Sequence, residues 1–421
     1  MTNNGRTRIL LICNTPPGSG AVGPLILNEL CQEVTPSQLH VACLGQPNKK
    51  YASPAEVDCR FFPVQEVSGW NRSRIGKNIG CALAYSLRSV TTYRRAARDI
   101  VRYARKLGVT TVWTILANPS AYVIGPMVAK RLAVPHLATI WDPPVGVCLE
   151  SRIGRVARSV ISRRFNWAVR SATRVAGISE HMSSEYRSRF GVSIETVRLG
   201  VRKIPEVLEH FEDPQREFRV GFCGSIYAVS EWEQLLRTLE EMEWEVHGAP
   251  VRLVVASNRI PSLRSCCEAR VTYHGWCNGS RVKELLADCH VGYFPYWFHR
   301  AYSDSVRLCF GTKLTTYFAA GLPVLYHGPR DSAVATFCEQ YGCATFAYAN
   351  EVHSLAKAIE DAADVASQKQ LRKGVVRAVQ SELNDHVMRQ RLQWFLYGTS
   401  PLANAAPGTG SCQRDTMWAE P

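Results

Sequence analysis

Apolar runs alternate with amphipathic stretches along the chain, which is the pattern of strands that alternate with helices. Residues 8–13 (RILLIC) read as a buried strand, and a Gly/Pro-rich turn separates them from a helix with Leu27 and Leu30 on its apolar side. This unit opens a doubly wound α/β domain, whose ligands bind at the carboxyl edge of the sheet. Further strands of the first half are predicted at 39–44, 59–63, 112–116, 136–141 and 174–178.

The alternation stops and restarts once. Residues 204–217 carry few periodic apolar positions and include Pro205 and Pro214, so we expect a linker there. Strands then recur at 218–223, 251–256, 271–274 and 290–295. These patterns predict two domains, over 1–203 and 218–384, then a helix over 385–398 and a disordered Pro/Gly-rich tail over 399–421.

The stretch 303–328 reads as loop, short helix, tight turn and buried strand. Lys313 opens the helix, Gly321 ends it, and Pro323 prevents its continuation. The helix dipole disfavours a cation at a helix start, but an outside anion such as a phosphate would be held by the lysine and the free backbone N–H groups together. The alternative is a solvated lysine on an ordinary surface helix.

The positive charge of the chain is concentrated in two segments of its first half, which suggests an anionic partner for that half. The net charge is +14; segment 72–106 has ten Lys/Arg against one acid, and segment 152–174 has seven Arg and no acid. The partner would be an anionic membrane surface, a phosphorylated lipid or nucleic acid, and the alternative is a solvated basic face. No nucleic-acid fold motif occurs and aromatic residues are not interleaved with the basic ones, so we expect no nucleic acid.

The fifteen cysteines are scattered and mostly lie in apolar runs, so we expect reduced core thiols in a reducing compartment. The close pair Cys266–Cys267 has no second cluster that would complete a zinc site. No signal peptide and no apolar run of a membrane span are apparent. The expected location is therefore the cytoplasm, with a peripheral place at the inner face of a membrane if the basic segments bind lipid.

Several segments, in this order, resemble those of GT-B glycosyltransferases of family 4 and its relatives (glycosyl transferases group 1). They are RILLICNTPPGSG, TIWDPP, RVAGISEHM, GFCGSIY, VTYHGW, HVGYFPY and GTKLTTYFAAGLPVLYHGP. The resemblance covers about residues 8–397. It implies two Rossmann-like domains facing across a cleft, with the acceptor on the N-terminal domain, a nucleotide-diphosphate-sugar on the C-terminal one, and the last helix crossing back. It also implies retention of configuration without a metal ion or cofactor, and the absence of an acidic D-x-D motif agrees.

On the donor side, the resemblance assigns Lys313 the catalytic task of stabilising the leaving diphosphate. The other donor-binding candidates are Gly224, Ser225, Ile226, Gly275, Trp276, Tyr296, Arg307, Leu314 (through its backbone N–H), Thr316 and Tyr317. Packing is the alternative for Trp276 and Tyr296, and a plain turn role for Ser225.

On the acceptor side, Asp142 is the candidate catalytic residue, positioning or deprotonating the acceptor hydroxyl. Gly18, Gly20 and Ser179 are the further acceptor-binding candidates. A turn-forming Asp before Pro-Pro and an N-capping Ser are the simpler interpretations of Asp142 and Ser179.

The sequence also departs from the family pattern. Thr316 and Leu308 stand where relatives commonly have Glu, and the usual Arg and Lys after the GSIY turn are missing, with Arg300 and Arg307 as candidate replacements. The resemblance as a whole implies sugar transfer to a lipid-linked or polysaccharide acceptor. The alternatives are a nucleotide-sugar 2-epimerase of the same fold or a degenerate, non-catalytic sugar-nucleotide-binding protein, which the departures would allow.

Overall fold

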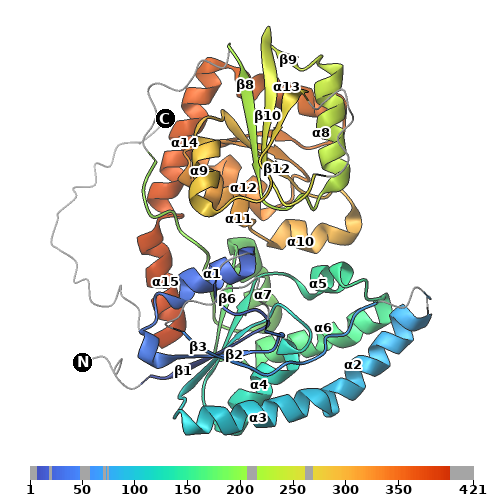
Figure 1. The fold of residues 1–421 in the computed structure, drawn as a ribbon, viewed down its shortest axis with the longest axis vertical. Helices are drawn as coiled ribbons and strands as arrows, with labels where there is room; N and C mark the ends of the chain where they lie inside the picture. Colours follow the sequence, from blue (N-terminus) through green and yellow to red (C-terminus); the bar gives the residue numbers. More distant parts are fainter. Residues whose placement is uncertain are drawn as a thin grey trace, which may run out of the picture.

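Two parallel β-sheets, one in each half of the chain, form the framework of the protein (Figure 1). The computed structural model describes residues 7–18, 21–47, 57–69, 73, 75–205, 216–260 and 269–398. Gly20, Arg72, Arg74, the pair Cys266–Cys267 and the tail predicted from 399 lie outside the described residues.

The N-terminal sheet has the strand order β3-β2-β1-β4-β5-β6-β7, and every pairing is parallel. Helices cover both faces, so the central strands are buried on both sides and need continuous apolar runs. The strands are β1 (Ile9–Cys13), β2 (Leu39–Cys43), β3 (Asp58–Phe61), β4 (Thr111–Ile115), β5 (His136–Ile140), β6 (Arg174–Gly177) and β7 (Ile194–Thr196).

The helical stretch after residue 75 is divided at Thr91, whose φ of −115° and ψ of −90° are not helical. The helices are α1 (Val22–Cys31), the 3₁₀ turn η2 (Pro36–Gln38), the π-helical turn η3 (Gly76–Gly80), α2 (Cys81–Val90), α3 (Thr92–Lys106), α4 (Ala121–Leu132), α5 (Pro144–Glu150), α6 (Arg155–Arg170) and α7 (Glu180–Phe190).

The C-terminal sheet has the order β11-β10-β8-β12-β13-β14, again parallel, with the short β9 antiparallel to β10. Its strands are β8 (Phe218–Cys223), β9 (Glu245–Val246), β10 (Ala249–Ala256), β11 (Val271–Tyr273), β12 (Val291–Pro295), β13 (Val324–His327) and β14 (Ala344–Ala347). Its helices are α8 (Val229–Glu241), α9 (Gly279–Ala287), the 3₁₀ turn η5 (Arg300–Tyr302), α10 (Ser303–Leu308), α11 (Thr312–Ala319), α12 (Ala333–Tyr341), α13 (Val352–Ala363) and α14 (Val365–Ser381).

The last helix, α15 (Asp385–Tyr397), returns to the N-terminal sheet and packs against β6 and β7 (Figure 1). The Arg174 side chain donates hydrogen bonds to the carbonyl groups of Phe395 and Leu396, at 2.7 and 2.9 Å. Val201 and Asn384 pair as an isolated β-bridge, so the outgoing and returning chains run side by side between the domains.

Each sheet has its topological switch point beside the first strand of its domain, at β1/β4 and at β8/β12. In such sheets, ligands bind in the crevice outside the carboxyl ends of the strands at that point. The predicted fold, two doubly wound α/β domains, is confirmed. The residues that follow β1, β4, β5, β8, β10 and β12 are therefore the first place to look for a site.

Candidate functional site

The turn after β8 is built for close approach of a ligand to backbone. Gly224 has a φ of +87°, a conformation that favours glycine, and its N–H donates to the carbonyl of Ala256 at 2.9 Å. A cavity of about 380 Å³ lies beside the turn and is lined by Ser225, Ile226, Val229, Ser257, Asn258 and Arg259. The predicted turn Gly224–Ile226 thus borders a cavity at the carboxyl ends of β8 and β10.

Lys313 meets this turn from α11. Its ammonium donates to the carbonyl oxygen of Ser225 at 3.0 Å and lies 4.2 Å from the centre of the Tyr227 ring. The side chain is buried, and this desolvation lowers the pKa of Lys313 to about 8. The structure therefore brings Lys313 and the turn together, as expected, with the ammonium supporting the turn from its buried side.

The two other donor-binding candidates that we predicted on the buried face of α11 are engaged within the domain. The backbone N–H of Leu314 already donates to the Gly311 carbonyl at 3.0 Å. Tyr317 is fully buried against β12, and its hydroxyl donates to the Tyr293 carbonyl at 2.8 Å. Both side chains form the apolar face that holds α11 on the sheet, so they point away from the cavity. Thr316 is half-buried, and its hydroxyl donates to the Thr312 carbonyl at 3.2 Å.

The aromatic candidates divide. Tyr296 is buried among other rings and its hydroxyl donates to the Cys309 carbonyl at 3.0 Å, so the packing alternative holds and the predicted donor contact is wrong. Trp276 is 54% exposed, beside Gly275 with its φ of +67°. The packing alternative is therefore wrong for Trp276, and its indole is accessible to a ligand.

Arg307, a predicted donor-binding residue, lies in a contact between the domains. Its guanidinium forms an ion pair with Glu185 of α7 and a second contact, 3.5 Å, with Asp304. Arg307 therefore ties α10 to the N-terminal domain. A cation that the motifs did not single out, the exposed Arg259, lines the donor-side cavity instead. Its signal was its place just after β10, at the ligand-binding edge of the sheet.

On the acceptor side, Asp142 follows β5 and remains accessible to water, although protein encloses it on most sides. This desolvation raises the pKa of its carboxyl, while a hydrogen bond from the Cys309 thiol, 3.4 Å from Oδ1, opposes the shift. An accessible carboxylate with a raised pKa at the carboxyl edge of the sheet can orient a hydroxyl or exchange a proton with it.

The remaining acceptor candidates lie elsewhere. Ser179 is buried: its hydroxyl oxygen caps α7 by accepting the Met182 N–H at 2.9 Å and its O–H donates to the Leu308 carbonyl at 2.6 Å. The N-cap interpretation is correct and the predicted acceptor contact is wrong. The Gly18 N–H donates to the Pro24 carbonyl at 3.0 Å, within its own loop; its predicted acceptor contact stays a prediction.

The segment after α10 joins the two domains. Leu308 is 1% exposed and belongs to the apolar core of the N-terminal domain, although it comes from the C-terminal half of the chain. Phe310, two residues on, lies 4.0 Å from the Arg198 guanidinium in a cation–π contact. The position where relatives commonly have Glu is thus apolar here because its side chain inserts into the other domain.

A pocket with several polar side chains in its lining lies at the carboxyl ends of β1 and β4, and it was not predicted from the sequence. Its volume is about 210 Å³, and its lining includes Asn14, Glu66, Asn118 and Trp141. Glu66 accepts hydrogen bonds from Asn14 Nδ2 at 3.0 Å and from both the N–H and the hydroxyl of Ser120, and burial raises the pKa of its carboxyl. Asn14 and Asn118 had a signal, their place just after strands, whereas Glu66 lies in a loop.

Asn14 carries a second indication of a ligand. Its Oδ1 atom is buried and has no hydrogen-bond partner in the part of the chain that the structure describes. Buried polar atoms are normally paired, and a hydroxyl-bearing ligand in this pocket would supply the missing donor.

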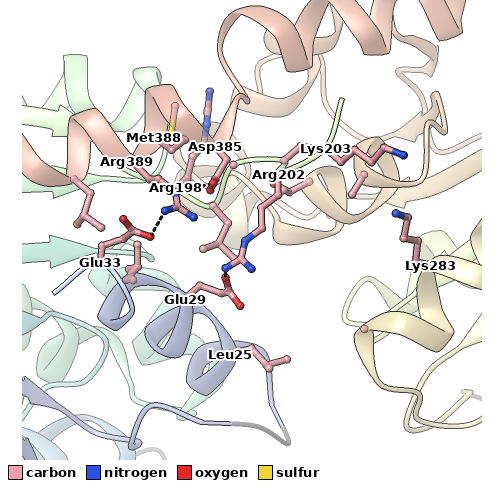
Figure 2. A pocket seen from close by; sticks show the side chains of 18 residues that line it. Leu25, Glu29, Glu33, Arg198, Arg202, Lys203, Lys283, Asp385, Met388 and Arg389 are labelled. Carbon is pink, nitrogen blue, oxygen red and sulfur yellow. Dashed lines mark hydrogen bonds and ion pairs between the residues drawn. The ribbon is translucent and has the colours of Figure 1, made fainter. Parts of the chain in front are cut away.

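A larger cavity of about 500 Å³ opens beside the linker, between the domains (Figure 2). Its lining comes from α1, the chain after β7, α9, α11 and α15. Most of its charges are already paired: Arg202 with Glu29, and Arg389 with Glu33 at 3.0 Å and Asp385 at 2.7 Å. Lys283 of α9 is exposed at the other side of the opening (Figure 2).

Among the described residues, no group of three His, Cys, Asp or Glu side chains is arranged to hold a metal ion. No helix in the described ranges is both long and apolar enough to cross a bilayer. The twelve cysteines in those ranges are all free thiols.

Comparison with known proteins relates the C-terminal half of the chain to a family of enzymes. Residues 217–364 match the sequence profile described as Glycosyl transferases group 1. The C-terminal domain is therefore similar in sequence to group 1 glycosyl transferases. No curated protein gives a significant sequence match to the chain.

Solved structures of GT-B glycosyltransferases have the same fold. Sucrose-phosphate synthase from Thermosynechococcus elongatus superimposes with a TM-score of 0.63 at 14% identity, covering 91% of this chain and 96% of that one. The α,α-trehalose 6-phosphate synthase of Burkholderia multivorans gives 0.60 at 11%, covering 97% and 100%. WaaG, a glycosyltransferase of lipopolysaccharide biosynthesis, gives 0.60 at 11%, covering 93% and 100%. The GT-B fold thus extends over both domains, and the family match supports glycosyl transfer.

Proposed function

We propose that the protein transfers a sugar from a nucleotide-diphosphate-sugar to a lipid-linked or polysaccharide acceptor, with retention and without a metal ion. The observation that carries the proposal is the Gly224–Ile226 turn, which borders a cavity at the carboxyl ends of β8 and β10 and is held by the buried Lys313. A diphosphate leaving group needs oriented donors where its charge develops, and turn N–H groups of a doubly wound domain supply them.

Donor binding in this proposal uses three groups around the turn. The backbone of Ser225 and Ile226 approaches the diphosphate, Arg259 supplies the cation, and the exposed face of Trp276 stacks on the base. Lys313 positions the turn through its hydrogen bond to the Ser225 carbonyl, and its nearby ammonium adds positive potential.

Acceptor binding uses the polar pocket of the N-terminal domain. Its volume of about 210 Å³ suits one sugar ring, and Asn14 and Glu66 offer the amide and carboxylate groups that hold hydroxyls. Asp142 orients the reacting hydroxyl. The leaving phosphate oxygen can take the proton of that hydroxyl, so Asp142 need not act as a base.

One observation favours a second candidate, the non-catalytic sugar-nucleotide-binding protein. Leu308 is inserted in the N-terminal core and Arg307 is paired with Glu185, so neither is available to a donor.

The epimerase alternative needs a catalytic histidine at the site. His327, which ends β13, is buried, hydrogen-bonded to the Tyr293 hydroxyl at 2.8 Å, and desolvation lowers its pKa to about 4.

Incubation with a panel of nucleotide-sugars, with release of nucleoside diphosphate as the readout, separates these candidates. A transferase releases the diphosphate faster when a glycan or lipid-linked acceptor is added, and NMR of the product shows the anomer. Binding without release supports the non-catalytic protein. A 2-epimer of the intact nucleotide-sugar supports the epimerase.

A further inference from the structure

A row of large apolar side chains lies exposed along α2 and the turn before it. Ile75, Ile79, Leu83 and Leu87 follow one another at intervals of four residues, with exposed fractions of 72%, 53%, 65% and 63%, and Val90 ends the row at 51%. The opposite face of α2 is buried through Cys81, Tyr85 and Ser89, so the helix is anchored and the apolar row faces outward. We call these five residues the α2 stripe.

An exposed contiguous apolar row of this kind marks an interaction surface rather than ordinary surface composition. Elsewhere in the described ranges, exposed large apolar side chains such as Val229 of α8, or Val22 and Leu25 of α1, do not form a row of this length. Helix α2, which carries the stripe, lies at the outer edge of the N-terminal domain, where it runs beside α6 and is followed by α3 (Figure 1). It is therefore available to a flat partner.

The flanks of the stripe are strongly basic. On α3, Arg94, Arg95 and Arg98 are exposed directly after it. On α6, which packs along α2, Arg155 and Arg163 are exposed, together with the apolar Val156 (50%) and Trp167 (37%). The one acid of α3, Asp99, is already paired with Arg102 at 2.8 Å, and α6 contains none.

We propose that the α2 stripe and its basic flanks dock the N-terminal domain on an anionic membrane surface, with the stripe entering the headgroup region and the arginines contacting lipid phosphates. An apolar face bordered by Arg and Lys is the pattern of a helix that lies in a membrane interface. A second copy of this chain is a poor occupant, because a two-fold contact would place like-charged flanks together.

The docking face deepens the proposed function, because it rests on the same acceptor domain and names the surface that presents a lipid-linked acceptor. Its test does not depend on sugar transfer. Vesicle binding needs no donor, whereas nucleotide binding can be measured without vesicles, so either proposal can fail while the other stands.

The test is flotation of the full chain with vesicles of phosphatidylcholine alone or mixed with phosphatidylglycerol. The wild type is expected to float with the anionic vesicles and to stay behind with the neutral ones, and added salt weakens its binding. The variant Leu83→Asn/Leu87→Asn removes apolar contact without touching charge, and partitioning falls on the order of tenfold. The partitioning of the variant Arg94→Gln/Arg95→Gln/Arg98→Gln onto anionic vesicles falls by a similar factor.

A matched control is Lys357→Gln/Lys369→Gln/Lys373→Gln, which removes the same charge from exposed positions of the C-terminal domain. Its flotation equals that of the wild type if the docking face is local. Equal partitioning of the wild type onto neutral and anionic vesicles, or unchanged flotation of the Leu83→Asn/Leu87→Asn variant, overturns the proposal. The proposal is also overturned if the wild type binds no vesicles but forms a dimer in light scattering, and the Leu83→Asn/Leu87→Asn variant is monomeric. That result would assign the stripe to contact with a second copy of the chain.

Discussion

The thiol of Cys309 donates a hydrogen bond to the carboxylate of Asp142, with Sγ 3.4 Å from Oδ1. Cys309 belongs to the segment between α10 and α11 of the C-terminal domain, and Asp142 follows β5 of the N-terminal domain. The contact places the acceptor-side carboxylate next to the segment that leads into α11 and Lys313. Its neighbours Arg307, Leu308 and Phe310 make further domain-bridging contacts, so one short segment contacts both the acceptor side and the donor side.

Asp142→Asn should slow transfer, because an amide holds the acceptor hydroxyl less firmly than a carboxylate does, while it stabilises the fold at neutral pH. Desolvation raises the pKa of Asp142, so the folded state binds its proton more tightly than the unfolded state does. The stability that this group contributes is present at low pH and is lost as pH rises through the folded pKa. The gain in Tm of the Asn variant over the wild type should therefore be larger at pH 7 than at pH 4. An equal gain at both would contradict a titrating, desolvated carboxylate.

Leu308→Ala should lower the free energy of unfolding by about 2–4 kcal/mol, because it leaves a cavity in the N-terminal core. Leu87→Ala, on the exposed α2 stripe, is the matched control and should change it by less than about 0.5 kcal/mol. Denaturant unfolding monitored by fluorescence measures both.

Leu308→Glu restores the residue type that relatives commonly have at this position, yet it should not raise activity. The carboxylate would enter an apolar core without a partner, and the variant should be destabilised more than Leu308→Ala is. A folded Leu308→Glu variant with faster transfer would show that the segment leaves the core during catalysis.

Thr316→Glu should tighten nucleotide binding on the order of tenfold, since a carboxylate at this position of α11 could accept ribose hydroxyls. Thr315→Glu is the control, because that neighbouring side chain lines the cavity of about 500 Å³ beside the linker instead. Calorimetry with both variants decides the matter. Equal effects would mean a general charge effect, and no effect at Thr316 would mean that the ribose lies elsewhere.

Nucleotide affinity should fall as pH rises through about 8, the pKa to which burial lowers Lys313 from 10.5. The folded state binds this proton less tightly than the unfolded state, so the contribution of Lys313 to stability rises with pH from about 8 to 10.5. Affinity and the Lys313 contribution to stability thus move in opposite directions across this range. Affinity that is flat from pH 7 to 9.5 would exclude a role for the ammonium in donor binding.

The strands were predictable because parallel strands buried on both faces need unbroken apolar runs, and residues 218–223 match β8 at both ends. The place of the site's backbone was also predictable. A glycine directly after a buried strand indicates a turn with positive φ, as at Gly224, and the carboxyl ends of parallel strands meet at one edge of the sheet. Side-chain directions were not. Tyr296, Tyr317, Ser179 and Arg307 are engaged by packing or by the other domain, and contacts between distant segments leave no local pattern. Glu66 lies in a loop whose partners, Asn14 and Ser120, are 52 and 54 residues away.

The central claim is that the Gly224–Ile226 turn and Lys313 form the site of a nucleotide diphosphate. Isothermal titration of UDP, GDP, ADP, CDP and dTDP into the wild type, Lys313→Met and the exposed-lysine control Lys369→Met tests it most directly. The account predicts that the wild type and Lys369→Met bind at least one of these nucleotides with equal affinity, and that folded Lys313→Met loses binding. Absence of binding by the wild type to all five, or undiminished binding by Lys313→Met, would contradict it.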